Sequence, residues 1–396
     1  MRRRGRRLRG RHPRPAAGRA AAPRPREGNG LHRRIGPGAR GRRRIRGKDR
    51  DRRRSEGPRD DGLDRKDPEI GLVNLLLVRL SSLGDVVHAL PIAANARRSG
   101  ARVGWVVESA YRELVDGNPD VDEVFFADTR NWRRRPFSPR TYAEMRSIFR
   151  RLRRFSPDAT IDAQGLWKSA VLARAAGGPV VGFGTADRRE RGSVLLCDRT
   201  VKPVVGRHIV DHNLALAEAA GIPVRVRSPD ARFLLGRPSP EADAFLAGQT
   251  RPFAVYHPGA SRPEKTWGEE RFAELARLVS DGGRMSAVVS WGPGDEERAF
   301  RMSKILPQAR LLPLLPLAGL ARVIAASSLF IGGDTGPLHL ADAVGAPTLA
   351  LFGSTDPDHN TPARNGPYRS PGSAIRYDSA TGAEEVARKA FEVLAA

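Results

Sequence analysis

The sequence of 396 residues contains one cysteine, Cys197, and no apolar run close to the roughly 20 residues that a membrane-spanning helix requires. A single cysteine excludes an intrachain disulfide and is compatible with a reducing compartment. The N-terminus is charged but no apolar core follows it, which excludes a secretory signal. We therefore expect a soluble, cytoplasmic protein without a membrane span.

Two nucleotide-binding signatures are missing as well. Neither half of the chain has a G-x-G-x-x-G sequence after its first predicted strand, which argues against a dehydrogenase. No Walker A sequence occurs, which argues against a P-loop NTPase. The eight histidines are scattered without ligand-like spacing, and the "DPD" sequence at 356–358 resembles an ordinary proline-containing turn. No metal is therefore expected.

Large apolar residues are scarce in the first 70 residues, which hold 26 Lys and Arg against 9 Asp and Glu. Such a segment buries too little surface to offset its ordering entropy, so we predict a disordered basic extension. It is either an arm that binds nucleic acid or acidic lipid, or it has no such role, being a solvated tail or upstream sequence translated from a start codon set too early. We favour the second reading. The rest of the chain has a net charge of only +8 and suits an anionic partner such as a nucleotide or a phosphorylated lipid.

From Val73 onward, short apolar runs alternate with segments of helical periodicity. The runs include "NLLLVRL", "RVGWVVE", "EVFFAD", "ATIDAQG" and "PVVGFG", and then "FAVYHPGA", "MSAVVSWG", "ARLLPL", "SLFIGGD" and "PTLALFG". This alternation predicts parallel sheets covered by helices. Residues 234–243 are rich in Pro, Gly and Ser and resemble a linker between two series of strands.

The predicted fold is therefore α/β, with two doubly wound parallel-sheet domains that face a central cleft. The predicted boundaries are 1–70 for the basic extension, 71–236 for the first domain and 237–396 for the second.

Each predicted domain places an acid where a strand gives way to a helix. Asp85 follows "NLLLVRLSSLG", and Asp334 follows "SLFIGG". Ligands of open α/β sheets bind at this carboxyl edge, so two such edges suggest one substrate for each domain. Taken alone, Asp85 is either a helix cap or a catalyst, and the sequence does not decide between them.

The turn after Asp334 is the strongest local signal in the second domain. Thr335 and Gly336 precede Pro337, a residue that suits a first helical turn. Free N–H groups at a helix start bind anions, although Asp334 or Thr335 acting as a plain cap is about equally compatible with the sequence. Lys265 follows a loop from which its charge would reach a diphosphate, or it is simply solvated. Glu296 suits a ribose diol, or it is a first-turn acid that favours the helix dipole.

Four stretches together resemble glycosyltransferase family 9, the bacterial lipopolysaccharide heptosyltransferases, and most of all its type I branch. They are "VRLSSLGDVVHALP" (78–91), "DAQGLWKSA" (162–170), "WGPGDEERA" (291–299) and "DTGPLHLADAVGAPTLALFGSTDP" (334–357). The resemblance begins near residue 73 and implies the GT-B fold, with the acceptor on the first domain and the nucleotide sugar on the second. It implies inverting, metal-independent transfer of L-glycero-D-manno-heptose from ADP-heptose, a substrate and not a cofactor, to the Kdo of Kdo2-lipid A.

The resemblance also implies roles for single residues. Asp85 matches the proposed catalytic base. The residues that match the donor site are Lys265, Glu296, Asp334, Thr335, Gly336, His339 and Ser261. The residues assigned to the acceptor are Arg79, Ser82, Gly84, Lys168, Arg130 and Arg133, the last two in a cluster that also reads as a solvated basic loop.

Three other functions stay open at this point. The first is another family 9 transferase that acts on the second heptose site or on a different glycan. The second is an inactive sugar-nucleotide binder. The third is a nucleic-acid-binding protein that acts through its Arg-rich extension. The lipid acceptor would bring the enzyme to the cytoplasmic face of the inner membrane as a peripheral protein. No specific nucleic acid is expected as a partner, and the sequence leaves the oligomeric state open.

Overall fold

A computed structural model describes residues 73–185, 190–202, 206–259, 266–280, 285–353 and 361–396. The predicted extension over residues 1–70 lies outside these ranges, so its disorder stays a prediction. Ser261, Lys265 and the "DPD" sequence at 356–358 lie outside them as well. Within the described ranges, no helix is long and apolar enough to cross a lipid bilayer.

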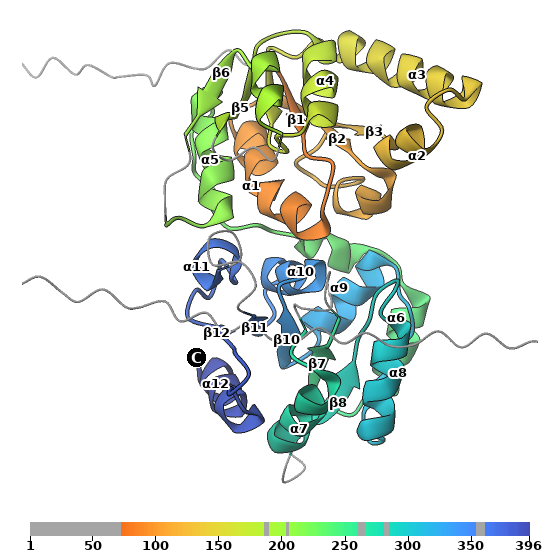
Figure 1. Ribbon diagram of the computed structural model, residues 1–396, viewed down its shortest axis with the longest axis vertical. Coiled ribbons are helices and arrows are strands. Elements are labelled where there is room, and N and C mark those ends of the chain that lie inside the picture. Colours follow the sequence, from red (N-terminus) through yellow and green to blue (C-terminus); the bar gives the residue numbers. More distant parts are fainter. Residues whose placement is uncertain (1–72, 186–189, 203–205, 260–265, 281–284, 354–360) are drawn as a thin grey trace, which may run out of the picture. The chain divides into compact units, whose positions relative to one another are not determined.

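Two parallel sheets of six strands each form the framework of the described chain (Figure 1). The first has the order β3-β2-β1-β4-β5-β6. Its strands are β1 (Asn74–Val78), β2 (Arg102–Val107), β3 (Glu123–Phe126), β4 (Ala159–Asp162), β5 (Val180–Phe183) and β6 (Arg199–Val201). The second has the order β12-β11-β10-β7-β8-β9. Its strands are β7 (Phe253–His257), β8 (Ser286–Val289), β9 (Arg310–Leu311), β10 (Leu329–Gly333), β11 (Thr348–Phe352) and β12 (Ala374–Arg376).

Both sheets have the same doubly wound order when the strands are counted from the first strand of each half. Strands one and four lie side by side at the centre, as β1 pairs with β4 and β7 pairs with β10. The chain reverses its winding direction at these pairs, and this is where ligands of doubly wound sheets bind. The structure therefore confirms the predicted α/β class, whereas the predicted domain boundaries stay predictions.

Helices flank both sheets. In the first half they are α1 (Leu83–Arg98), η1 (Ser109–Leu114), α2 (Thr129–Arg134), α3 (Pro139–Phe155), α4 (Trp167–Ala176), η3 (Arg191–Leu196) and α5 (Ile209–Ala219). The later ones are η4 (Arg232–Gly236), α6 (Pro240–Ala247), α7 (Glu269–Ser280), α8 (Glu296–Ile305), α9 (Leu317–Ala325), α10 (Gly336–Val344), α11 (Pro362–Asn365) and α12 (Ala383–Ala395).

The stretch 234–243, predicted to be a linker, is mostly helical. Its first residues end η4 and its last residues begin α6, so only 237–239 connect the two elements. Ser239 precedes Pro240 at the first turn of α6, and Ser followed by Pro is a helix-start signal as much as a loop signal.

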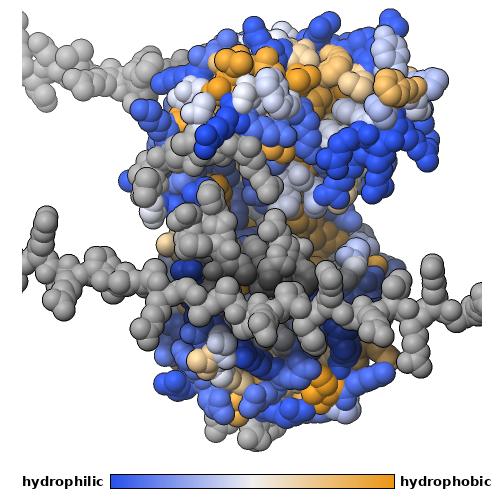
Figure 2. Space-filling model, viewed as in Figure 1, coloured by the Kyte–Doolittle hydropathy of each residue, from blue (hydrophilic) through white to orange (hydrophobic). Residues whose placement is uncertain are grey.

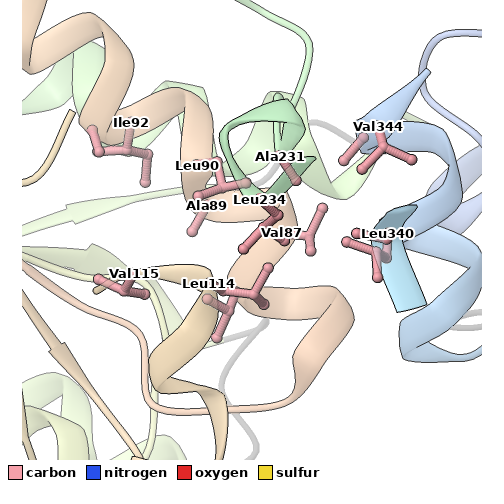
Figure 3. Close-up of a cluster of buried hydrophobic side chains, with 14 of the residues drawn as sticks. Val87, Ala89, Leu90, Ile92, Leu114, Val115, Ala231, Leu234, Leu340 and Val344 are labelled. Carbon is pink, nitrogen blue, oxygen red and sulfur yellow. The ribbon is translucent and has the colours of Figure 1, made fainter. Parts of the chain in front are cut away.

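The helices that follow the central strands of the two sheets, α1 and α10, pack against each other. Figure 3 shows Val87 and Leu90 of α1 beside Leu340 and Val344 of α10. Leu234 of η4 joins them, and all five side chains are at most 5% exposed. Because each helix begins directly after its strand, this shared core holds the carboxyl edge of β1 next to that of β10.

Candidate active site

The turn between β1 and α1 holds a carboxylate and a guanidinium in direct contact. Arg79 forms an ion pair with Asp85, in the first turn of α1. The other carboxylate oxygen of Asp85 accepts hydrogen bonds from the backbone N–H and the hydroxyl of Ser82, each at 2.9 Å. Ser82 is the N-cap residue of α1, so Asp85 does close a capping box. The cap that the sequence suggested is present.

The capping hydrogen bonds leave part of the Asp85 carboxylate accessible. Its side chain remains 37% exposed, whereas Arg79 is almost completely covered. The surrounding protein raises the pKa of Asp85, but the guanidinium of Arg79 and the two hydrogen bonds from Ser82 outweigh this, so the pKa lies below its ordinary value. An ionised and partly accessible carboxylate at a strand edge is able to accept a proton.

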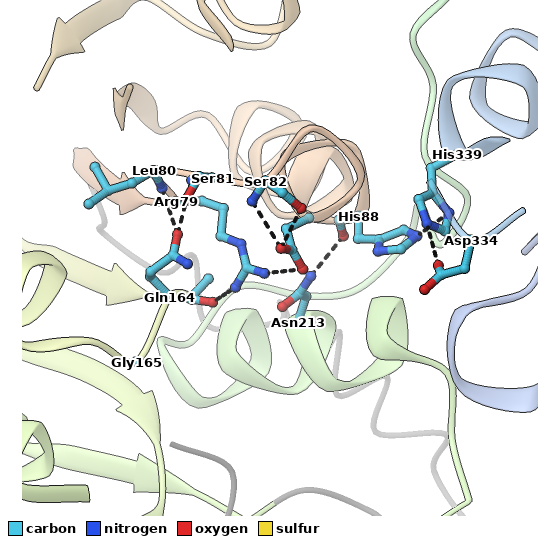
Figure 4. A network of polar contacts seen from close by, with 12 residues as sticks. Arg79, Leu80, Ser81, Ser82, His88, Gln164, Gly165, Asn213, Asp334 and His339 are labelled. Carbon is cyan, nitrogen blue, oxygen red and sulfur yellow. Dashed lines mark hydrogen bonds and ion pairs between the residues drawn. The ribbon is translucent and has the colours of Figure 1, made fainter. Parts of the chain in front are cut away.

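The neighbouring strand β4 holds this turn in place from the other side of the switch point. Arg79 donates a hydrogen bond to the carbonyl oxygen of Ala163, immediately after β4. The side-chain oxygen of Gln164 accepts the backbone N–H groups of Leu80 at 2.9 Å and Ser81 at 3.1 Å (Figure 4). The "DAQG" sequence is thus the part of the chain that positions the Arg79 turn.

At the second switch point, α10 begins at Gly336 with Thr335 as its N-cap residue. The hydroxyl of Thr335 donates to the carbonyl oxygen of Gly333 at 3.2 Å and makes no capping hydrogen bond to the helix. Asp334 contacts the ring of His339 instead, with 3.2 Å between Oδ1 and Nε2. Thr335 thus occupies the N-cap position but does not cap the helix through its side chain, and the positive end of the helix dipole lies at this turn.

The two switch points meet through a pair of histidines. Nε2 of His88, on α1, lies 3.1 Å from Nδ1 of His339, on α10 (Figure 4). One of these two nitrogens carries a proton and donates it in a hydrogen bond. The other nitrogen accepts this hydrogen bond through its lone pair. Asn213 of α5 donates a hydrogen bond to the backbone oxygen of His88 at 2.9 Å. A continuous polar path thus connects Asp334 to α1.

Two glycines allow this close approach. A Cβ atom at Gly84 would lie 2.2 Å from Cδ2 of His339, and one at Gly336 would lie 2.3 Å from Cδ2 of Leu83. Leu83 therefore occupies the space that a side chain at position 336 would need. In this arrangement the glycine serves the contact between α1 and α10.

We expect Gly84→Ala to lower turnover by at least about 10-fold, because α1 and α10 must separate to admit the new methyl group, and misplacements near 1 Å can cost about 100-fold. Steady-state kinetics would measure this. The matched control is Gly236→Ala, where a Cβ atom meets nothing within 4 Å. Equal turnover in both variants would show that the close contact has no role in catalysis.

The histidines make the fold sensitive to acid. Burial is the main cause that lowers the pKa of His208 to about 4, although a hydrogen bond from its ring to the carbonyl oxygen of Gly366 opposes this. Burial also places the pKa of His88 well below its ordinary value, with His339 as the next cause. Both rings are therefore neutral in the folded chain at pH values where an unfolded chain binds protons.

We expect the free energy of unfolding to fall as the pH drops from about 6.5 toward 4. A histidine with a pKa near 6.5 in the unfolded chain and about 4 in the folded chain costs about 2 kcal/mol at pH 5. Urea unfolding at pH 7 and pH 5 would measure the difference, which His208→Gln should reduce. Identical stability at the two pH values would refute this electrostatic picture.

The remaining predicted acceptor residues lie apart from this network. Lys168 on α4 donates to the hydroxyl of Thr129 at 2.9 Å and pairs with Glu108 at 3.2 Å, a carboxylate that is 2% exposed. Arg130 of α2 donates to the hydroxyl of Tyr111 at 3.3 Å. The guanidinium of Arg133 is exposed. Lys168 thus neutralises a buried acid, and a role of these three residues in acceptor binding stays a prediction.

Glu296 closes the turn that precedes α8, and its role in ribose binding stays a prediction. It is exposed, and its carboxylate accepts the backbone N–H of Gly294 at 2.9 Å. The neighbouring Asp295 lies closer to the carboxyl edge of β7, because a Cβ atom at Gly259 would come within 2.3 Å of its Oδ2. Burial raises the pKa of Asp295, and the charge of Glu296 adds to this, against the effect of Arg298.

Several residues of the network were not predicted as site residues. The sequence did not single out His88, Gln164 or Asn213. The repeated order of strand, acid and histidine in "LGDVVH" and "GGDTGPLH" was the available signal for the His88 contact. Among the described residues, no three side chains of His, Cys, Asp or Glu are grouped to hold a metal ion. Metal independence itself stays a prediction.

Comparisons with known proteins identify the family of this chain. The family model "Glycosyltransferase family 9 (heptosyltransferase)" matches residues 145–386, well over half of the chain. The chain belongs to glycosyltransferase family 9. Lipopolysaccharide heptosyltransferase 1 of Pseudomonas aeruginosa is 37% identical over 72% of this chain and 80% of its own length. The enzyme of the same name from Escherichia coli K12 is 33% identical over 72% of this chain and 89% of its own length.

A solved family 9 structure has the same fold. Escherichia coli heptosyltransferase WaaC with ADP superposes with a TM-score of 0.68 at 30% identity, covering 81% of this chain and all of that one. The same enzyme with ADP-2-deoxy-2-fluoro heptose gives a TM-score of 0.65 at 29% identity, over 81% of this chain and 99% of that one. The two sheets with their flanking helices are therefore a GT-B glycosyltransferase fold.

Proposed function

We propose that this chain is a lipopolysaccharide heptosyltransferase that transfers L-glycero-D-manno-heptose from ADP-heptose to the Kdo of Kdo2-lipid A. The observation that carries the proposal is the Arg79–Asp85–Ser82 arrangement at one switch point, which His88 and His339 connect to the N-terminus of α10 at the other. Heptosyltransferases of family 9 are its relatives, and one of them has been solved with ADP.

In the proposed reaction, the acceptor hydroxyl attacks the anomeric carbon of the heptose as the bond from that carbon to the ADP oxygen breaks. Attack from the face opposite the leaving group inverts the anomeric centre. Asp85 accepts the proton of the hydroxyl, and such general-base help is worth roughly 10²–10⁴ in rate. Arg79 keeps Asp85 ionised before this step.

The leaving diphosphate is assigned to the second half of the chain. The N-terminus of α10 at Thr335 and Gly336 offers backbone N–H groups and the positive end of the helix dipole. These groups are fixed before the reaction, so they stabilise the growing charge on ADP without reorganisation. Lys265 and Ser261, which follow β7 in the sequence, are proposed to complete the donor site, and Glu296 is proposed to bind the ribose.

We expect Lys265→Ala to weaken ADP-heptose binding by roughly 10- to 100-fold, the usual range for a hydrogen bond to a charged group. Titration calorimetry with ADP-heptose would measure the dissociation constant. The control is Lys202→Ala, which removes an exposed lysine from the first half of the chain. An unchanged dissociation constant for Lys265→Ala would mean that this lysine is merely solvated.

The acceptor is tested by exchanging it. The full-length protein is incubated with ADP-heptose and either Kdo2-lipid A or the same lipid already carrying one heptose, and the lipid mass is read by mass spectrometry. The proposal predicts a gain of one heptose on Kdo2-lipid A only. A gain on the heptosylated lipid alone would make the chain a second-site family 9 transferase. Because the acceptor is a lipid, we also propose that the protein works as a peripheral protein at the cytoplasmic face of the inner membrane.

A further inference from the structure

The positive charge of the folded part is concentrated in one segment. Residues 71–396 hold 43 Lys and Arg against 35 Asp and Glu. Residues 129–155, which form α2, α3 and their connection, contribute ten arginines and one glutamate to these numbers. The remainder of 71–396 therefore has a net charge of −1. The mild basicity of this part of the chain is a property of one surface.

The helix α3 displays this charge away from the protein core. Its buried side chains, at most 6% exposed, recur at helical spacing and face the first sheet: Thr141, Ile148, Leu152 and Phe155. Arg146, Arg150 and Arg153 fall on the opposite side of the helix and are exposed. Arg154 lies next to them, and we call these four residues the arginine face.

The arginine face is not used inside the protein. Elsewhere on α3, Arg151 pairs with Glu123 and Arg140 pairs with Glu144. No described residue forms an ion pair or a side-chain hydrogen bond with the four guanidinium groups of the arginine face. Like charges along one side of a helix destabilise it slightly, so their presence calls for an anionic partner outside the chain.

Exposed apolar side chains accompany the arginine face. Phe137, between α2 and α3, is 98% exposed, and Tyr142 of α3 is 69% exposed. The helix α4 packs beside α3 and exposes Trp167 and Val171, and η3 packs on α4 and exposes Leu195 by 81%. Figure 2 shows hydrophobic and strongly hydrophilic side chains together over the part of the molecule that carries α3 and α4 in Figure 1.

We propose that the arginine face, with Phe137 and Tyr142, docks the protein onto an anionic phospholipid bilayer. Arginines bind lipid phosphates bidentately, and aromatic side chains settle at the level of the headgroups. A bilayer accounts for the exposed aliphatic side chains of Val171 and Leu195 better than nucleic acid does, because bases stack on aromatic rings but not on aliphatic side chains. This inference rests on the proposed function in one respect, since an acceptor with acyl chains is met at a bilayer.

The test must separate this face from the basic N-terminal extension, which also attracts anionic lipid. In the full-length chain with Cys197→Ala, an environment-sensitive fluorophore is attached at Ala143→Cys, an exposed position on α3, or at Ser379→Cys, an exposed position in the second half. Each protein is mixed with phosphatidylglycerol vesicles or phosphatidylcholine vesicles, without donor or acceptor. We expect a blue shift of the emission at position 143 with phosphatidylglycerol only, and none at position 379.

Arg146→Gln, Arg150→Gln and Arg153→Gln combined should abolish the shift at position 143, since each arginine near the surface strengthens binding about fivefold. The matched control combines Arg98→Gln, Arg376→Gln and Arg388→Gln, which remove the same charge elsewhere and should keep the shift. Equal emission shifts at positions 143 and 379, or no emission shift at position 143, would overturn the proposal. An emission shift at position 143 that survives the first triple substitution would also overturn it. So would an emission shift with duplex DNA but not with vesicles. Because no sugar transfer is measured, this result is independent of the proposed reaction.

Discussion

Asp85→Asn is expected to lower turnover by roughly 10²–10⁴ while ADP-heptose binding stays nearly unchanged. The amide cannot accept the proton of the acceptor hydroxyl, yet it has almost the same shape and still offers an oxygen to the N–H of Ser82. Donor contacts are assigned to the second half of the chain, so the dissociation constant of the donor should not move. Single-turnover kinetics and calorimetry on the same preparation would measure both quantities.

Asp116→Asn serves as the matched control, because the side chain of Asp116 is 50% exposed and pairs with Arg112 on the surface. It should retain full turnover. If Asp85→Asn turned over as fast as this control, Asp85 would be left with its capping role alone. If donor binding were lost together with turnover, the substitution would have disturbed the fold, and the test would move to thermal unfolding of the variant.

Arg79→Met is expected to have the second largest effect, because it removes the cation that keeps Asp85 ionised. Without Arg79, the enclosure of Asp85 by protein raises the pKa of this carboxyl against the Ser82 hydrogen bonds and the smaller effect of His339. The acid limb of the pH–rate profile should move to higher pH by roughly 1–3 pH units. Stability at pH 7 should fall by about 2 kcal/mol, less than for a fully buried pair, because Asp85 is 37% exposed.

Arg79→Lys distinguishes the charge of this residue from its shape. A lysine keeps a cation beside Asp85 but loses the fork that also reaches the carbonyl oxygen of Ala163. We expect its acid limb to stay near that of the wild type, although turnover falls. An acid limb that moves equally in both variants, or in neither, would contradict the account of the Asp85 pKa.

The interior strands that the sequence predicted are buried on both faces, whereas the edge strands β3 and β9 were predicted from short apolar runs and are partly exposed. "NLLLV" in β1 and "FAVYH" in β7 are apolar because helices cover both sides of a parallel sheet. The edge strands β6 and β12 were not predicted, since each is three residues long, partly exposed and without an apolar run. Strands of this length carry no period that can be distinguished from a loop.

The site was predictable up to the point where the two halves meet. Asp85 and Asp334 were located because parallel strands present their carboxyl ends to ligands, which is a property of each half alone. The contact between His88 and His339 spans 251 residues and depends on how α1 packs against α10, which local patterns do not encode. The same holds for Gly336, whose neighbour Leu83 comes from the other half.

The most direct test of the central claim compares wild type and Asp85→Asn in one experiment. Full-length protein saturated with ADP-heptose is mixed with Kdo2-lipid A, and the mass of the lipid is followed over time. The account predicts that wild type adds one heptose and that Asp85→Asn adds it at least 100-fold more slowly. Bound ADP-heptose without any gain in lipid mass by the wild type would contradict the proposed transfer, and equal rates would contradict Asp85 as its base.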